Sequence, residues 1–256
     1  MLNRKSEWAF EWERMQNISP YLFANWIYPN KLKDFKNKTV LDCGCGMGGH
    51  INLVAPIAKK VVGVDLYTSH VAKKNTKHNK NVTILRKDIT TMRLKEKFDI
   101  VYAVGVIHHT ENPDKTFQNI KRHLKKNGRL IIWVYSYEGN FLNRTLLEFL
   151  KKKFFLKLSR SMLLKIATLI TFLIYIPVYT IYMIPIDFLP FYQYFTRWRK
   201  LSFRENLLNI FDKLNAPKTF FIKRETIEKW FNRNDFRKIH ISNYLNTSWR
   251  ASGIKK

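Results

Sequence analysis

The chain has 256 residues, of which 46% are hydrophobic and 15% are aromatic. This composition is sufficient for a full hydrophobic core and excludes a wholly disordered chain. The formal net charge is +27 at pH 7. An excess of this size either favours an anionic partner, such as nucleic acid, an acidic membrane or a phosphorylated substrate, or reflects a general enrichment in lysine. Bulk charge alone does not decide between the two.

The N-terminal residues and the two cysteines bear on the cellular compartment in which the protein is expected. Residues 1–17 contain charged side chains where a signal peptide would need an apolar core, so no secretion signal is predicted. Cys43 and Cys45 are separated by one residue, a spacing unsuited to an ordinary disulfide. We therefore expect a reducing, cytoplasmic environment.

The predicted elements begin with an aromatic-rich segment, residues 1–38, which we expect to form short helices that cover the edge of the next domain. From residue 39, short apolar runs typical of buried parallel strands alternate with polar helical stretches. The predicted strands are 39–42, 60–65, 82–88, 98–104 and 129–135. The predicted helices are 48–58, 69–79 and 114–126, the last closed by Asn127-Gly128. This alternation predicts a parallel sheet with helices on both faces.

After residue 140 the pattern changes. Residues 141–200 are rich in Leu, Phe and Lys, and residues 166–186 contain no charged side chain. That length could cross a bilayer. However, strands of one sheet are predicted before and after the segment, so a single crossing would divide the sheet between the two sides of a membrane. Two interpretations remain: a helical lid over the ligand site, or helices that lie in a membrane interface or dip into the bilayer and return.

Basic residues on both sides of this segment favour contact with acidic lipid, because basic clusters beside an apolar helix are typical of interfacial binding. They are Lys151, Lys152, Lys153, Lys157, Arg160 and Lys165 before it, and Arg197, Arg199, Lys200 and Arg204 after it. The α/β pattern then returns with a predicted helix at 224–234 and two strands at 236–245 and 248–254, joined by a short turn.

A glycine-rich loop follows the first predicted strand. In VLDCGCGMGGH three glycines satisfy G-x-G-x-x-G, and Asp65 ends the next strand about 20 residues further on, as in dinucleotide sites. Asp42, directly before the loop, and Asp88, at the end of the third strand, would repel a pyrophosphate. Both carboxylates suit a ligand with an ammonium and a sulfonium group, so the sequence favours a cationic amino-acid nucleoside.

Five segments in order over residues 36–136 resemble the motifs of class I S-adenosylmethionine (SAM)-dependent methyltransferases, specifically the bacterial type 11 or 12-like domains that act on small molecules, lipids or glycans: VLDCGCGMGG, VVGVDLY, LRKDIT, FDIVYAVGVIHHTENP and LKKNGRLIIWVY. The resemblance implies an α/β fold with a doubly wound, mostly parallel, seven-stranded Rossmann-like sheet, an antiparallel last strand and, here, a hydrophobic helical insertion. We accordingly divide the chain into an N-terminal cover (1–38), a SAM-binding core (39–140), the insertion (141–200) and the C-terminal completion of the core (201–256).

The same resemblance implies roles for individual residues, with SAM as the cofactor. Asp42 would hold the methionine ammonium, Asp65 would bind the ribose hydroxyls, and Leu66 would pack near the adenine. The other implied cofactor residues are Gly44, Cys45, Gly46 and Gly48 in the loop, Asp88 and Ile89 at the adenine edge, and Val104 and Gly105 at the pocket floor.

Two histidines follow the fourth predicted strand. His108 and His109 would face the methyl donor, and His109 is the better candidate for a general base that takes a proton from a hydroxyl acceptor. The alternative is that the pair only positions the next helix. Tyr135, Tyr137 and Tyr244 are candidates for the substrate side and equally for packing. No metal site is predicted, because the histidines show no ligand spacing with carboxylates.

The apolar insertion and the basic surface predict a small-molecule or lipid-linked acceptor: a hydroxyl of a lipid, a quinone precursor or a glycan, methylated at or near an anionic membrane. A nucleic-acid partner is disfavoured, since the sequence has no Pro-Pro-aromatic motif after the fourth strand, no cysteine placed for cytosine-C5 chemistry and no appended RNA-binding module. An RNA methyltransferase, supported by charge, and a non-catalytic SAM-binding protein remain the alternatives. The oligomeric state is not predicted.

Overall fold

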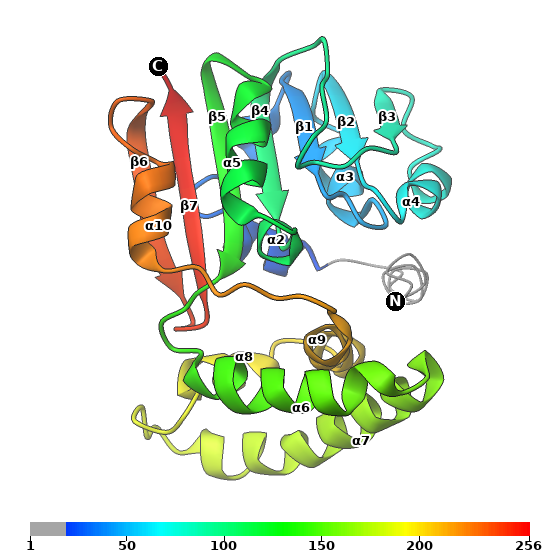
Figure 1. Cartoon of the computed structure of the whole chain (residues 1–256), viewed down its shortest axis with the longest axis vertical. Helices are drawn as coiled ribbons and strands as arrows, with labels where there is room; N and C mark the ends of the chain where they lie inside the picture. Colours follow the sequence, from blue (N-terminus) through cyan, green and yellow to red (C-terminus); the bar gives the residue numbers. More distant parts are fainter. Residues whose placement is uncertain (1–18) are drawn as a thin grey trace.

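The computed structural model describes residues 19–256 (Figure 1). The expected cover at 1–38 therefore lies partly outside the described residues. Its described part contains the helix α2 (Pro20–Trp26) and the short helix η1 (Leu32–Phe35), whose Phe23 and Phe35 are buried against the sheet.

A seven-stranded sheet forms the core, in the order β3-β2-β1-β4-β5-β7-β6. The strands are β1 (Thr39–Cys43), β2 (Lys60–Val64), β3 (Val82–Leu85), β4 (Phe98–Val104), β5 (Leu124–Tyr135), β6 (Phe236–Tyr244) and β7 (Ser248–Lys255). The pairs among β1 to β5 are all parallel, whereas β7 is antiparallel to both β5 and β6. This arrangement confirms the predicted fold class.

Helices cover both faces of the sheet because successive residues of each strand point to opposite faces. Val40 of β1 packs with α2, α3 (Gly49–Val54) and α4 (Ser69–Asn75) on one face. The next residue, Leu41, packs with α5 (Pro113–Arg122) and α10 (Arg224–Trp230) on the other face. Each central strand is therefore buried on both sides, which explains its uninterrupted apolar run.

A separate helical layer lies beyond the carboxyl ends of the parallel strands (Figure 1). It consists of η3 (Asn143–Leu147), α6 (Glu148–Lys153), η4 (Phe155–Lys157), α7 (Arg160–Val178), η5 (Ile181–Met183), α8 (Tyr192–Trp198) and α9 (Phe203–Asn215). Leu163 and Ala167 of α7 pack on Phe211 and Leu214 of α9 in a small core of their own. The layer thus extends to Asn215, beyond the boundary at 200 expected from the sequence.

The expected helix end at Asn127-Gly128 is wrong. Helix α5 ends at Arg122, and β5 already begins at Leu124. Leu124 pairs with Phe98, whereas the next pair joins Ile100 to Arg129, so the residues between them bulge out of the ladder. Leu124 is fully buried, and this burial extends the strand toward the N-terminus despite the turn residues that follow.

We expect the face covered by α5 and α10 to contribute strongly to stability. Phe117 is fully buried and stacks on Trp230, with ring centroids 4.9 Å apart. Phe117→Ala should lower the free energy of unfolding by about 3–5 kcal/mol through the cavity it leaves. Phe188→Ala is the matched control, because Phe188 is 85% exposed and its loss should change stability by less than about 0.5 kcal/mol. Urea denaturation measures both, and equal effects would contradict the packing described.

Candidate cofactor and acceptor site

Two adjoining cavities lie between the sheet and the helical layer, and they share His109, Trp133, Tyr135 and Asp212 in their walls. The larger has a volume of about 290 Å³ and the smaller about 80 Å³. Ten residues predicted from the sequence line the larger cavity: Gly44, Cys45, Gly46, Asp65, Leu66, Asp88, Ile89, Val104, Gly105 and His109. The other three, Asp42, Gly48 and His108, lie outside its lining.

The loop between β1 and α3 requires glycine. Gly44 has a φ of +80°, and a Cβ placed on it would lie 2.4 Å from a methyl carbon of Val106. Gly48, with a φ of +85°, precedes α3, where a Cβ would lie 2.6 Å from a methyl carbon of Thr76. Any side chain at these positions would therefore push the loop outward. The backbone at Gly44 to Gly46 borders the larger cavity directly.

Asp65 follows β2 and joins two backbone segments at the cavity wall. One carboxylate oxygen accepts the Gly46 N–H at 3.0 Å, and the other accepts the N–H groups of Tyr67 and Thr68 at 2.9 and 2.8 Å. The Thr68 hydroxyl donates to the Gly46 carbonyl at 2.9 Å and closes the connection. These bonds fix the carboxylate beside the glycine loop, where two ligand hydroxyls could approach both oxygens.

Asp88 and Ile89 line the cavity next to this position. Asp88 accepts the Thr90 N–H at 2.7 Å, and its carbonyl accepts the Met92 N–H at 2.7 Å, so the chain turns sharply away from β3. Ile89 is buried and contributes an apolar surface, as does Leu66 across the cavity. A flat aromatic base with polar edges fits between such apolar and carboxylate groups.

Asp42 lies behind the glycine loop and is only 1% exposed. Burial raises the pKa of Asp42 to about 8, although the Tyr102 hydroxyl donates a hydrogen bond to its carboxylate at 2.8 Å; the charge of Asp65 raises the pKa further. The carboxyl group therefore holds its proton at neutral pH unless a cation compensates. Its role toward the methionine ammonium stays a prediction.

The two histidines differ in position. His108 is fully buried, and its ring nitrogens have no hydrogen-bond partner among the described residues. Burial lowers the pKa of His108 far below its usual range, with His109 adding to the effect, so His108 stays neutral. His109 lines both cavities, and its Nδ1 lies 2.9 Å from the carbonyl oxygen of Lys218. That acceptor favours a proton on Nδ1, which leaves the lone pair on Nε2.

Burial also lowers the pKa of His109, but the charge of Asp212 opposes this shift. A proton on the His109 imidazole would therefore be stabilised by Asp212. Of the two histidines, His109 has both the access and the charge partner that a general base requires.

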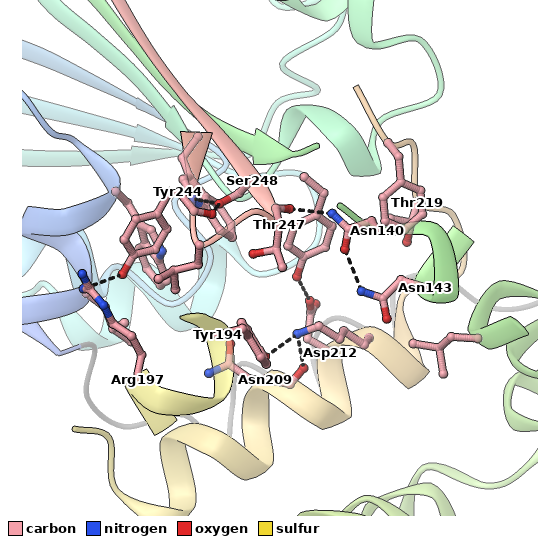
Figure 2. Close-up of a pocket in the computed structure, with 18 of the residues that line it drawn as sticks. Asn140, Asn143, Tyr194, Arg197, Asn209, Asp212, Thr219, Tyr244, Thr247 and Ser248 are labelled. Atoms are coloured by element: carbon pink, nitrogen blue, oxygen red, sulfur yellow. Dashed lines mark hydrogen bonds between the residues drawn. The ribbon is translucent and has the colours of Figure 1, made fainter. Parts of the chain in front are cut away.

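The smaller cavity contains polar residues of the helical layer that sequence analysis did not assign (Figure 2). Tyr135 donates its hydroxyl to Asp212 at 2.9 Å. Lys213 donates to the Tyr194 hydroxyl at 3.0 Å, and Arg197 donates to the Tyr244 hydroxyl at 3.2 Å. Of the three candidate tyrosines, Tyr135 and Tyr244 line this cavity.

The spacing of polar residues on α9 is the signal that would have identified this wall. Asn209, Asp212 and Lys213 recur at intervals of three and four and line the cavity, whereas Phe211 and Leu214 face α7. Tyr137, the third candidate tyrosine, instead lies under the Arg144 guanidinium, 3.5 Å from its ring centroid.

Lys151 and Arg160, two of the basic residues expected at the flanks of the insertion, make contacts within the helical layer. Lys151 is fully buried, pairs with Glu148 and donates to the Thr219 hydroxyl at 3.1 Å. Arg160 donates to the Asn215 side chain at 2.6 Å and to the Leu156 carbonyl at 3.1 Å. Both belong to the internal packing of the helical layer, because they compensate polar groups that the fold buries.

Comparison with known proteins defines the class of this site. Residues 41–132 match the family model described as a methyltransferase domain. In structure the chain is similar to a putative S-adenosylmethionine-dependent methyltransferase from Listeria monocytogenes, with a TM-score of 0.52, 18% identity, and 93% of this chain and 98% of that chain covered. It is also similar to magnesium protoporphyrin IX methyltransferase from Synechocystis, with a TM-score of 0.50, 15% identity, and coverage of 87% and 76%.

The fold, the glycine loop and the family match together show that the chain contains a class I SAM-dependent methyltransferase domain, with SAM as its cofactor. The residues fit this molecule: a loop in which only glycine can approach the ligand, Asp65 for hydroxyl groups, and apolar side chains beside Asp88 for a base.

In sequence the chain is similar to the tRNA U34 carboxymethyltransferases of Histophilus somni and Pseudoalteromonas atlantica. The identities are 30% over 148 residues and 27% over 140 residues, which cover 55% and 53% of this chain. The chain spans only 42% and 40% of the length of these relatives.

These relatives correct two expectations. A hydroxyl of a lipid, quinone precursor or glycan was the expected acceptor, and nucleic acid was disfavoured, yet the relatives are named for tRNA. The sequence criteria were too narrow. A Pro-Pro-aromatic motif and a catalytic cysteine are typical of methylation of exocyclic amines and of cytosine C5, so these criteria address two reactions and leave other reactions on RNA unaddressed.

The buried Asp42 should make stability depend on pH. The pKa of Asp42 is about 8 in the folded protein, whereas an unperturbed aspartate has a pKa of 3.8. The folded state thus binds one more proton than the unfolded state from about pH 5 to about pH 8, and stability falls as pH rises through that window. Asp42→Asn removes this loss, so urea denaturation should show the variant gaining relative to wild type by up to about 1.4 kcal/mol per pH unit.

The matched control for this measurement is Asp99→Asn. Burial opposes ionisation of Asp99, but hydrogen bonds from Thr39 and Lys125 outweigh it and lower the pKa of Asp99 to about 2. Asp99 is therefore ionised in both folded and unfolded states above about pH 5, so its variant should differ from wild type by a constant amount. A constant difference for Asp42→Asn as well would contradict the assigned protonation.

Proposed function

We propose that this protein is an enzyme that transfers a methyl-derived group from a SAM cofactor to RNA, with tRNA as the acceptor. The observation that supports this proposal most directly is the similarity to tRNA U34 carboxymethyltransferases, which extends over 140 to 148 residues. Because the chain spans about two fifths of those relatives, both the activity and the acceptor are proposals. We further propose a cytoplasmic location, consistent with two cysteines that are free thiols.

The walls of the smaller cavity support a nucleobase acceptor. Trp133 and Tyr135 line both cavities, and Tyr194 and Tyr244 line the smaller one. Aromatic rings of this kind stack on bases that have left their helix, and single-stranded bases are the usual targets of RNA-modifying enzymes. Asn143 and Asn209 bring amide oxygens to this cavity that could face the polar edges of a base, whereas the Asn140 amide is occupied by Ser136, Thr247 and Asn143.

Basic residues around both cavities support a polyanionic acceptor. Lys87 and Lys218 line the larger cavity, and Arg197 and Lys213 line the smaller one. Together with the net charge of +27 they favour phosphate contacts, which supply most of the affinity in nonspecific RNA binding.

The residues suggest how the acceptor would react. Bound SAM supplies an electrophilic carbon on its sulfonium sulfur. His109, neutral and open to both cavities, would take the proton that the acceptor loses, and Asp212 would stabilise the resulting imidazolium. Tyr135 holds Asp212 in position through its hydroxyl. All three side chains are partly buried, which strengthens their electrostatic interaction relative to that of fully solvated groups.

The direct test is transfer of label from [methyl-³H]SAM to unmodified tRNA. We expect label in the tRNA, and mass spectrometry of the digested nucleosides to identify the modified base. Asp65→Ala should weaken SAM binding at least ~10-fold in calorimetry and should abolish labelling. The reason is that three backbone N–H groups and the ligand all lose the Asp65 carboxylate as their hydrogen-bond acceptor. SAM binding that depends on Asp65, combined with unlabelled tRNA, would refute the RNA acceptor and leave the cofactor assignment standing.

The His109–Asp212 pair predicts a specific pH effect on that reaction. Asp212→Asn removes the charge that raises the pKa of His109, so the acidic limb of the pH–kcat profile should move to lower pH. The value of kcat should fall at least ~10-fold because the imidazolium loses its counter-charge. Tyr135→Phe should lower kcat without moving the limb. Asp187→Asn, an exposed acid of the same helical layer, is the control, and an identical profile shift in it would contradict the pairing.

A further inference from the structure

Exposed apolar side chains are concentrated on the helical layer. Of the twenty large hydrophobic residues that are exposed in the described part of the chain, fifteen lie between residues 141 and 188. Phe141, Phe149 and Phe188 are 64%, 57% and 85% exposed. An apolar concentration of this size is typical of an interaction surface, since soluble proteins seldom leave one in water.

Helix α7 shows how this surface is built. Leu163, Ala167 and Thr171 are fully buried on the side of α9. Residues at helical spacing on the other side are just as apolar: Leu169, Phe172 and Ile176 are 58%, 63% and 58% exposed. An 18-residue stretch of the helix has a mean hydropathy of 1.9, yet only 22% of this stretch is buried. The exposed side of α7 carries Ser161, Lys165 and Thr168 in its first half, but from Leu169 to Ile176 its exposed residues are all apolar.

The sheet excludes a membrane-spanning role for α7, which is the one described helix long and apolar enough to span. Strand β5 precedes the helix and β7 follows it, and the two pair along seven positions from Arg129–Ile254 to Tyr135–Ser248. A single crossing would place paired strands on opposite sides of a bilayer. A single crossing by α7 is therefore excluded. Contact along a membrane surface, as interfacial amphipathic helices make it, is compatible with the paired strands.

The charges beside the apolar surface identify its partner. Residues 141–200 contain ten basic and two acidic residues. Lys152, Lys153, Lys157 and Lys165 are exposed next to the apolar side chains, whereas the acid Glu148 is already paired with a buried lysine. Exposed lysines around an apolar centre complement anionic lipid headgroups above acyl chains. RNA binding would rely on aromatic stacking positions, whereas nine of the fifteen exposed apolar side chains between residues 141 and 188 are not aromatic.

We propose that the outer surface of α6, α7 and η5 docks on an anionic lipid bilayer and holds the protein peripherally. This surface, called here the outer apolar face, consists of Phe149, Met162, Leu169, Phe172, Leu173, Ile176, Ile181 and Met183. Docking leaves the cavities accessible from the other side of α9, because Phe211 and Leu214 of that helix face α7 while Asn209 and Asp212 face the cavity. The inference does not depend on the RNA acceptor.

Flotation of the full chain with lipid vesicles tests the proposal. Vesicles of phosphatidylcholine with phosphatidylglycerol should bind the protein at least ~10-fold more strongly than vesicles of phosphatidylcholine alone, since each lysine near an anionic surface adds to binding. The triple variant Leu169→Asn, Phe172→Asn, Ile176→Asn should lose at least ~10-fold in binding to the mixed vesicles. Its SAM affinity, measured by calorimetry, should stay unchanged because the three side chains lie outside both cavities.

A matched pair of charge variants locates the contact. Lys152→Glu, Lys153→Glu should reduce binding to the mixed vesicles at least ~10-fold. Lys33→Glu, Lys36→Glu changes the net charge equally at exposed positions of the sheet layer and should have little effect. Equal losses in both pairs, or vesicle binding that the triple variant retains, would overturn the proposal.

A second copy of this chain is the competing occupant of the outer apolar face. Light scattering that shows a dimer in wild type and a monomer in the triple variant, without vesicle binding by either, would overturn membrane docking in favour of self-association. Monomeric wild type that binds mixed vesicles through α7 supports the proposal. Because SAM binding is measured on the same samples, failure here is distinguishable from failure of the methyltransferase assay.

Discussion

Two backbone hydrogen bonds beside the end of β5 hold both ends of the helical layer at one place. The Tyr137 N–H donates to the Ile222 carbonyl, and the Ile222 N–H donates to the Tyr135 carbonyl, each at 2.9 Å. Residues 138–221 must therefore fold over the carboxyl edge of the sheet. The returning segment also donates the Phe220 N–H to the His108 carbonyl at 2.8 Å. This junction therefore brings α9, with Asp212, and the loop after β4, with His109, to the same cavity.

The cavity has two electrostatic parts that follow from this geometry. Strand ends supply Asp65 and Asp88 near the glycine loop, where a cationic cofactor needs negative charge. The returning segment and the turn before Asp88 supply Lys218 and Lys87, which suit a polyanionic acceptor. For the proposed RNA acceptor, these opposite charges would place the sulfonium ligand and the phosphate groups at different parts of one cavity.

The sheet could be predicted from the sequence because each buried strand is a short apolar run between turn residues. The cavity wall next to the cofactor could be predicted because the glycine loop and the acids at the strand ends lie in contiguous motifs. The inward side of the helical layer was not predictable in the same way. Lys151 and Arg160 belong to a basic cluster by composition, yet tertiary packing buries Lys151 and joins the half-buried Arg160 to Asn215. Asp212 meets His109 only through the junction at residues 137 and 222, a contact between positions far apart in the chain. The acceptor was predicted wrongly because the apolar and basic composition of residues 141–200 does not show which of these side chains face the cavity and which face outward.

A role as a lid over the cavities does not explain why the outer apolar face is apolar. A lid needs one apolar side, and α7 already satisfies that need by packing Leu163 and Ala167 against α9. Exposing Leu169, Phe172 and Ile176 to water stabilises nothing in the fold and costs solubility. Polar residues at these positions would keep the inner contacts intact. The composition of the outer stripe is therefore independent of cavity closure, and it calls for an apolar environment outside the protein, which a bilayer surface supplies.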